Sequence, residues 1–162
     1  EVLAWLEEKV RQVKKIDPHH PVTIGWSSVN AAMNLEEQLA FISYHYYDSP
    51  ELFEPALYVL RSKLKDKPIM ISEFGLSSYS GLWNVFKGSE EKQADYYSQM
   101  VSQFEKGQIS FLSWTLYDFE DIPVDVVGRL PWRRAPQKRY GLMGSDGRIK
   151  PAYEFMEVTS AK

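Results

Sequence analysis

The chain has 162 residues, a formal net charge of -3 and no cysteine, and 14% of its residues are aromatic. This is the length of one domain with a sizeable core, and the charge gives no general reason to expect a nucleic acid or an anionic membrane as partner. The absence of cysteine excludes a disulfide framework, a cysteine-based zinc site and a thiol nucleophile, and no apolar run approaches transmembrane length.

The first half of the chain predicts a helix, two strands and a second helix. Apolar residues recur at close to helical spacing over residues 2–16, and the segment "DPHHP" then ends that helix. Residues 22–26 and 39–47 are predicted strands, rich in aromatic and β-branched side chains. We expect the second helix at residues 55–64, because Pro55 suits a first turn and would break the middle of a helix.

The second half continues the alternation of strands and helices. The segment "PIMISEF", residues 68–74, is a predicted third strand, since its apolar run needs no solvated face. Ser89 is a suitable N-cap for a helix that ends near Gly107. Residues 108–117 form the predicted fourth strand.

After the fourth strand the pattern indicates a long loop to about Arg139, a hairpin at Asp146-Gly147 and a last helix from Pro151. Apolar strands that alternate with helices are typical of right-handed βαβ units with a parallel sheet. The sequence therefore predicts an α/β fold. A sheet of so few parallel strands would leave exposed edges, which invite pairing.

Polar and aromatic residues gather at the carboxyl ends of the predicted strands. In parallel α/β folds these ends share one rim, where ligands bind. We therefore expect side chains that are far apart in the sequence to converge: Trp26, His45, Tyr47, Glu73 and Trp114. They suit a neutral, polyhydroxylated ligand, because aromatic faces stack on sugar rings and a carboxylate can attack or stabilise an oxocarbenium-like centre.

Each candidate also has a structural interpretation. Glu73 can be a strand-end carboxylate paired with a nearby Arg or Lys, since an unpaired carboxylate is costly to desolvate. His45 can be a core histidine whose ring is hydrogen-bonded to a backbone carbonyl. We expect it not to bind a metal, because no second ligand lies at suitable spacing. Trp26 and Trp114 can be ordinary core residues.

Several segments resemble a known enzyme family. The stretches "ISYHYYDSP", "KPIMISEFG" and "FLSWTLYDF" resemble the sixth, seventh and eighth strands of cellulase-like (β/α)8-barrel glycoside hydrolases of family five and its clan relatives. The stretch "YGLMGSDGRIKPAYEFM" resembles the tail of such barrels. The resemblance implies that residues 1–162 are the C-terminal half of a catalytic barrel that cleaves β-linked glycosides or polysaccharides with retention. It also implies no cofactor and a secreted or extracellular location.

The resemblance implies roles for individual residues. Glu73 would be the nucleophile, and His45 and Tyr47 would match the family's His-x-Tyr, with the tyrosine near the nucleophile. Trp114 would match the tryptophan that floors the subsite next to the scissile bond. Because successive residues of a strand point to opposite faces, we expect Tyr47 to face inward and Tyr46 to face the helices.

The second carboxyl of the mechanism is missing from these residues. Retaining hydrolysis needs a carboxyl roughly 5 Å from the nucleophile to protonate the leaving group. In the family it belongs to an Asn-Glu pair that ends the fourth strand, and this chain has no Asn-Glu dipeptide. We therefore expect the acid/base in an N-terminal half outside this sequence, and these residues alone to be inactive.

Two other functions stay open. The chain can be a non-catalytic half-barrel that binds sugar weakly and self-associates through the strand edges at Val22–Trp26 and Gln108–Tyr117, for instance as a dimer. It can also belong to a barrel of unrelated chemistry in which Glu73 is a general base. The basic stretch "RLPWRRAPQKR" is interpreted as a charged loop and not as a nucleic-acid site, because no binding motif accompanies it.

Overall fold

The computed structural model describes residues 1–64, 66–82 and 88–160. It consists of two compact units. The first unit comprises Glu1–Phe74 with Gly107–Leu112, and the second comprises Gly75–Lys106 with Ser113–Lys162. The predicted sheet lies in the first unit, apart from the last residue of its fourth strand, so this unit carries the carboxyl ends of the first three strands.

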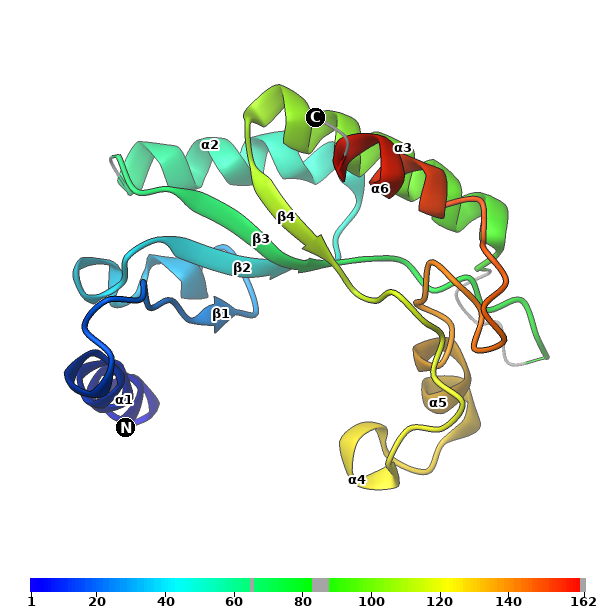
Figure 1. Cartoon of the computed structure of the whole chain (residues 1–162), viewed down its shortest axis with the longest axis horizontal. Coiled ribbons are helices and arrows are strands. Elements are labelled where there is room, and N and C mark those ends of the chain that lie inside the picture. The colour runs from blue at the N-terminus through cyan, green and yellow to red at the C-terminus, as the bar shows by residue number, and fades with distance from the viewer. Residues whose placement is uncertain (65, 83–87, 161–162) are drawn as a thin grey trace. The chain divides into compact units, whose positions relative to one another are not determined.

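A four-stranded parallel sheet forms the first unit, with the strands side by side in the order β1-β2-β3-β4 (Figure 1). The strands are β1 (Gly25–Trp26), β2 (Ile42–Tyr46), β3 (Ile69–Phe74) and β4 (Ser110–Ser113). All four predicted strands are confirmed, although β1 and β4 are much shorter than predicted. Before β1, the Ala40 N–H donates to the Val22 carbonyl at 2.9 Å and the Thr23 hydroxyl donates to the Phe41 carbonyl at 2.8 Å, so both backbone and side chain join these segments.

Helices separate the strands along the chain, as the sequence predicts. The longer ones are α1 (Val2–Ile16), α2 (Phe53–Lys63), α3 (Glu90–Gly107) and α6 (Tyr153–Ser160). Short 3-10 turns occupy Ala31–Met33, Glu36–Gln38 and Pro50–Leu52. The expected start of α2 at Pro55 is two residues late, because Pro55 occupies the third position of the helix, where its missing N–H has no partner to lose.

The long loop expected after the fourth strand is wrong in part. It contains the short helices α4 (Val124–Val127) and α5 (Pro131–Gln137). Pro131 stands at the first turn of α5, a position that proline favours. No helix among the residues that the structure describes is both long and apolar enough to cross a membrane.

The core of the first unit lies between the sheet and α2. Tyr46 at the end of β2 meets Phe53 at the start of α2 edge to face, with ring centroids 5.1 Å apart. Phe74 at the end of β3 meets Phe111 of β4 in the same way at 5.7 Å. Such aromatic pairs add stability beyond the area they bury, and they fix the strand ends against their surroundings.

The second unit is tied together by one buried amide on α3. The N-cap of this helix is as predicted, since the Ser89 hydroxyl accepts the Lys92 N–H at 3.1 Å. One turn later Gln93 is fully buried, and its side-chain amide donates to the carbonyl groups of Leu76, Tyr140 and Gly141. The predicted hairpin also forms, with the Gly144 N–H donating to the Arg148 carbonyl at 2.8 Å.

Candidate functional site

Glu73 and His45 face each other across neighbouring strands of the first unit. The strands β2 and β3 pair Tyr44 with Ile71, and the next pair is His45 with Glu73, so that Ser72 is an extra residue in β3. Such a β-bulge turns the side chains that follow it and is frequent beside active sites. In an unbroken register His45 would lie opposite Ser72, so the bulge is what aligns the imidazole with the carboxylate.

The two side chains are in direct contact. His45 Nδ1 lies 2.7 Å from Glu73 Oε2, with 35% of the imidazole and 19% of the carboxylate side chain exposed. The contact becomes an ion pair when the imidazole is protonated. It accounts for a carboxylate at the end of a buried run, and the partner is a histidine where the structural interpretation of the sequence expected Arg or Lys.

A cleft of about 300 Å³ opens beside His45 at the carboxyl ends of β1 and β2. Hydroxyl, amide, imidazole and carboxylate groups line it, from Ser27, Ser28, Asn30, His45, Tyr47 and Asp48. Tyr47 exposes 43% of its surface there. No Lys or Arg is among its lining residues. These groups both donate and accept hydrogen bonds, as the hydroxyls of a neutral sugar require.

Tyr46 and Tyr47 take opposite roles, although they are adjacent in the sequence. Tyr46 is buried, and its hydroxyl donates to the Ser49 carbonyl at 2.8 Å. Burial raises the pKa of Tyr46. Tyr46 therefore packs in the core beside Phe53, while Tyr47 is the exposed tyrosine of the two and lines the cleft.

Trp26 is in the core of the first unit and is only 7% exposed. It pairs with Tyr44 across β1 and β2. The indole Nε1 and the Tyr44 hydroxyl are both buried without a hydrogen-bond partner among the described residues. Burial also raises the pKa of Tyr44. The substrate-binding role of Trp26 stays a prediction, and in this structure its ring is covered.

Trp114 belongs to the second unit and directly follows β4. The residue is 39% exposed, and its indole lies near the ring of Phe119, with ring centroids 5.9 Å apart and the planes at 43°. A Cβ at Gly75 would overlap the Trp114 carbonyl oxygen, so only glycine fits at this close approach of two backbones. The structure thus brings His45, Tyr47 and Glu73 together in the first unit and places Trp114 in the second.

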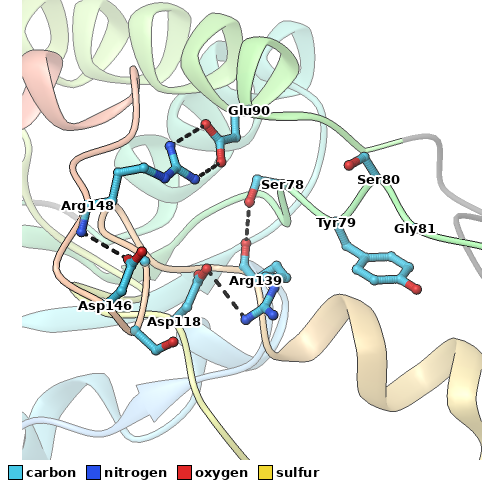
Figure 2. Close-up of a pocket in the computed structure, with 11 residues that line it drawn as sticks. Ser78, Tyr79, Ser80, Gly81, Glu90, Asp118, Arg139, Asp146 and Arg148 are labelled. Carbon is cyan, nitrogen blue, oxygen red and sulfur yellow. Dashed lines mark hydrogen bonds and ion pairs between the residues drawn. The ribbon is translucent and has the colours of Figure 1, made fainter.

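A second cleft, of about 390 Å³, lies within the second unit (Figure 2). Arg148 reaches from the hairpin and forms a bidentate ion pair with Glu90 at the start of α3, with one contact at 3.0 Å. The hydrogen bond from Arg148 lowers the pKa of Glu90. Arg139 faces Asp118 across the same cleft at 3.7 Å.

A buried ion pair supports this second cleft. Lys150 Nζ lies 2.6 Å from Asp118 Oδ1 and 3.0 Å from the Ser78 hydroxyl, and the Gly141 N–H donates to the same Asp118 oxygen at 2.9 Å. Burial lowers the pKa of Lys150, and the hydrogen bond to Asp118 opposes that shift. The sequence does not reveal this pair, because its two residues are far apart and neither lies in a periodic pattern.

A metal site in the described part of the chain would need several ligand side chains close together. Among residues 1–64, 66–82 and 88–160, no group of three or more His, Asp or Glu side chains is arranged to hold a metal ion.

Comparisons with known proteins identify the fold. No family model matches the chain, and no curated protein matches it. Among solved structures, a β-1,3-glucanosyltransferase from Rhizomucor miehei, crystallised with laminaritriose, is 19% identical with a TM-score of 0.71, over 93% of this chain and 56% of that one. A GH2 β-galacturonidase from Eisenbergiella tayi is 18% identical with a TM-score of 0.78, over 97% of this chain and 30% of that one. An FMN-binding β-glucuronidase from Faecalibacterium prausnitzii is 22% identical with a TM-score of 0.75, over 96% and 26%.

These neighbours are glycoside hydrolases with TIM-barrel-like folds, and the chain spans about half or less of their length. The predicted fold class is confirmed: the chain is α/β, of the (β/α)8-barrel type, with parallel strands and alternating helices that amount to about half a barrel. Ligands of such barrels bind at the carboxyl ends of the strands. The pair of His45 and Glu73 lies at these ends.

Proposed function

We propose that the chain forms part of a retaining glycoside hydrolase that cleaves β-glycosidic bonds, with Glu73 as its nucleophile. The observation that carries this proposal is the contact of His45 with Glu73, aligned by a β-bulge beside a polar cleft at the strand ends. A partly exposed carboxylate oriented by an imidazole is able both to contact a sugar and to attack it.

The reaction proceeds in two steps. A Glu73 oxygen bonds to the anomeric carbon while the bond from that carbon to the leaving-group oxygen breaks, and an acid protonates the leaving group. Water, deprotonated by the same group, then displaces Glu73 and releases the sugar. We assign the acid/base to a partner half-barrel outside this sequence, because the neighbours extend well beyond the part that this chain covers.

The remaining residues bind the sugar. His45 holds the Glu73 carboxylate through Nδ1 and contacts the sugar with the part of its ring that lines the cleft. Tyr47 contacts the nucleophile or the adjacent sugar from the cleft. Trp114, which is partly exposed, stacks on a sugar ring, because sugars favour aromatic faces.

The cleft and the neighbours support a proposal for the substrate class. The neighbours named above act on glucans or on uronides, so the shared feature is a β-linked sugar. The lining of the His45 cleft includes Asp48 and no Lys or Arg, which favours a neutral sugar over an acidic one. We therefore propose a neutral β-glycan as substrate, with a cellulase- or mannanase-like activity.

The test is Glu73→Gln in the complete barrel, which comprises this chain and the half that supplies the acid/base. We expect turnover to fall by orders of magnitude with an unchanged circular dichroism spectrum, because an amide cannot attack the anomeric carbon. Glu91→Gln, which neutralises an exposed carboxylate on α3, is the matched control and should keep full activity. Near-normal turnover of Glu73→Gln would exclude Glu73 as the nucleophile.

The complete barrel also distinguishes the proposed function from two alternatives. If the protein is a non-catalytic sugar-binding module, favoured by the missing Asn-Glu dipeptide, it binds oligosaccharide but releases no product. If Glu73 is a general base of unrelated chemistry, a slow fluorinated glycoside leaves no adduct on it. A glycosyl adduct on Glu73, detected by peptide mass, supports the retaining mechanism over both.

A further inference from the structure

The imidazole of His45 is in close contact with the backbone of β1. If Gly25 had a Cβ, this atom would lie 2.9 Å from His45 Nε2 and 3.7 Å from the Ser72 hydroxyl oxygen. Real Cβ atoms essentially never approach another heavy atom to less than 3.0 Å, so a side chain at Gly25 forces a shift, and the atom nearest to it is on the imidazole of His45. The space that His45 occupies therefore exists because residue 25 is glycine.

The imidazole has contacts on both sides. Its Nε2 edge faces Gly25 on β1, and its Nδ1 lies 2.7 Å from Glu73 Oε2 on β3. The ring belongs to β2, which lies between these two strands in the sheet (Figure 1). Because the imidazole is rigid and planar, a push at Nε2 moves Nδ1 as well, and the contact with Glu73 changes with it.

Neither the backbone conformation nor burial explains why residue 25 is glycine. Gly25 is not among the glycines with a positive φ, so its backbone conformation is open to any residue. It is also exposed, so overall core packing does not forbid a methyl group. Glycine inside a strand is unfavourable, and it often marks a close approach of another group.

We propose that Gly25 is a positioning residue, which leaves the space that His45 needs to stay in contact with Glu73. Its effect on the geometry of the pair stands by itself. Its effect on turnover rests on the proposed function, in which Glu73 attacks the sugar.

The direct test is Gly25→Ala in the isotope-labelled 162-residue chain, with the imidazole nitrogen chemical shifts of His45 as readout. We expect these shifts to move from the wild-type values toward those of the Glu73→Gln chain, in which the contact with the carboxylate is lost. Gly107→Ala, the same change in a residue of the first unit that has no contact with His45, should leave them in place. A folded Gly25→Ala chain with wild-type His45 shifts would overturn the proposal.

A double-mutant cycle separates positioning from a general defect in folding. In a His45→Ala background, Gly25→Ala should cause no further loss of stability, because the ring that it displaces is gone. If Gly25→Ala alone does not fold, the His45→Ala, Gly25→Ala chain should recover folding. A double variant that is less stable than His45→Ala by the full cost of Gly25→Ala would show that the Cβ collides with another group, and the proposal fails.

Turnover in the complete barrel gives the link to function. We expect Gly25→Ala to lower kcat by about 10- to 100-fold, as a misplaced catalytic group typically does, with a small change in KM. If Glu73→Gln keeps its activity while Gly25→Ala still shifts the His45 signals, the proposed function fails and the positioning role stands.

Discussion

Lys150 is the most fully enclosed charge among the described ion pairs, with 1% of its side chain exposed beside an Asp118 side chain that is 5% exposed. Both charges have lost most of their hydration, and their hydrogen bonds to each other, to Ser78 and to Gly141 replace it. Such a pair adds little over an apolar core of the same shape, but losing one partner leaves the other charge buried alone.

Lys150→Met is therefore expected to lower the free energy of unfolding by about 3–5 kcal/mol. Adding Asp118→Asn should restore part of that loss, because a neutral amide costs less to bury and its oxygen still accepts the Gly141 N–H. Urea denaturation measures both. Lys138→Met removes a lysine whose partner Asp121 is 75% exposed, and it should cost under about 1 kcal/mol. Equal losses for the two lysines would contradict the assignment.

At the scale of elements, the start of α3 is joined to the hairpin by the ion pair of Glu90 with Arg148. Arg148 lowers the pKa of Glu90 from its ordinary value of 4.5. A lowered pKa in the folded state means that the unfolded chain binds a proton more readily. The pair thus stabilises the fold fully above pH 4.5, and the stabilisation is lost as the pH falls through the folded-state pKa.

Arg148→Gln should consequently make the melting temperature less sensitive to acid. We expect the wild type to lose stability more steeply than the variant as the pH falls below about 4.5, with the two curves parallel nearer neutrality. Thermal melts across this range provide the measurement. Arg11→Gln removes an arginine from the exposed pair with Glu8 on α1 and serves as control. Identical acid profiles for wild type and Arg148→Gln would refute the coupling.

Elements with a long, regular pattern could be predicted from the sequence. The apolar run of residues 69–71 and the stripe of α3 identify a strand and a helix, since burial imposes the period. The helices α4 and α5 could not, because four and seven residues are too few to display a helical period. The N-cap of α3 could also be predicted, because Ser89 directly precedes an uninterrupted helical segment.

The proximity of His45 and Glu73 could be predicted from the sequence, but the geometry of their contact could not. Parallel strands share a rim, which is enough to expect His45 near Glu73. The bulge at Ser72 could not be foreseen, because nothing in "PIMISEF" distinguishes an extra residue from a paired one. The need for Gly25 was equally hidden, because it arises only when three strands bring the imidazole against a backbone that is distant in sequence.

At the scale of the whole molecule, the sheet has two free edges. The outer strands are β1 and β4, and neither has a further neighbour within the described sheet. Leu112 on β4 is 55% exposed, so the edge is apolar as well as unpaired. Unpaired strand edges of this kind are templates for pairing with another chain. The solved neighbours are longer chains, of which this one spans 56% and 30%.

We therefore expect the 162-residue chain alone to self-associate at micromolar concentration, with the strand edges in contact. Sedimentation velocity at several concentrations measures the association. Leu112→Lys places a charge on the edge strand and should shift the chain toward the monomer. Leu52→Lys charges a leucine of equal exposure, 56% against 55%, that lies outside the sheet, and it should leave association unchanged. A wild-type monomer at all concentrations would contradict edge pairing. Association weakened equally by both lysines would locate the contact elsewhere.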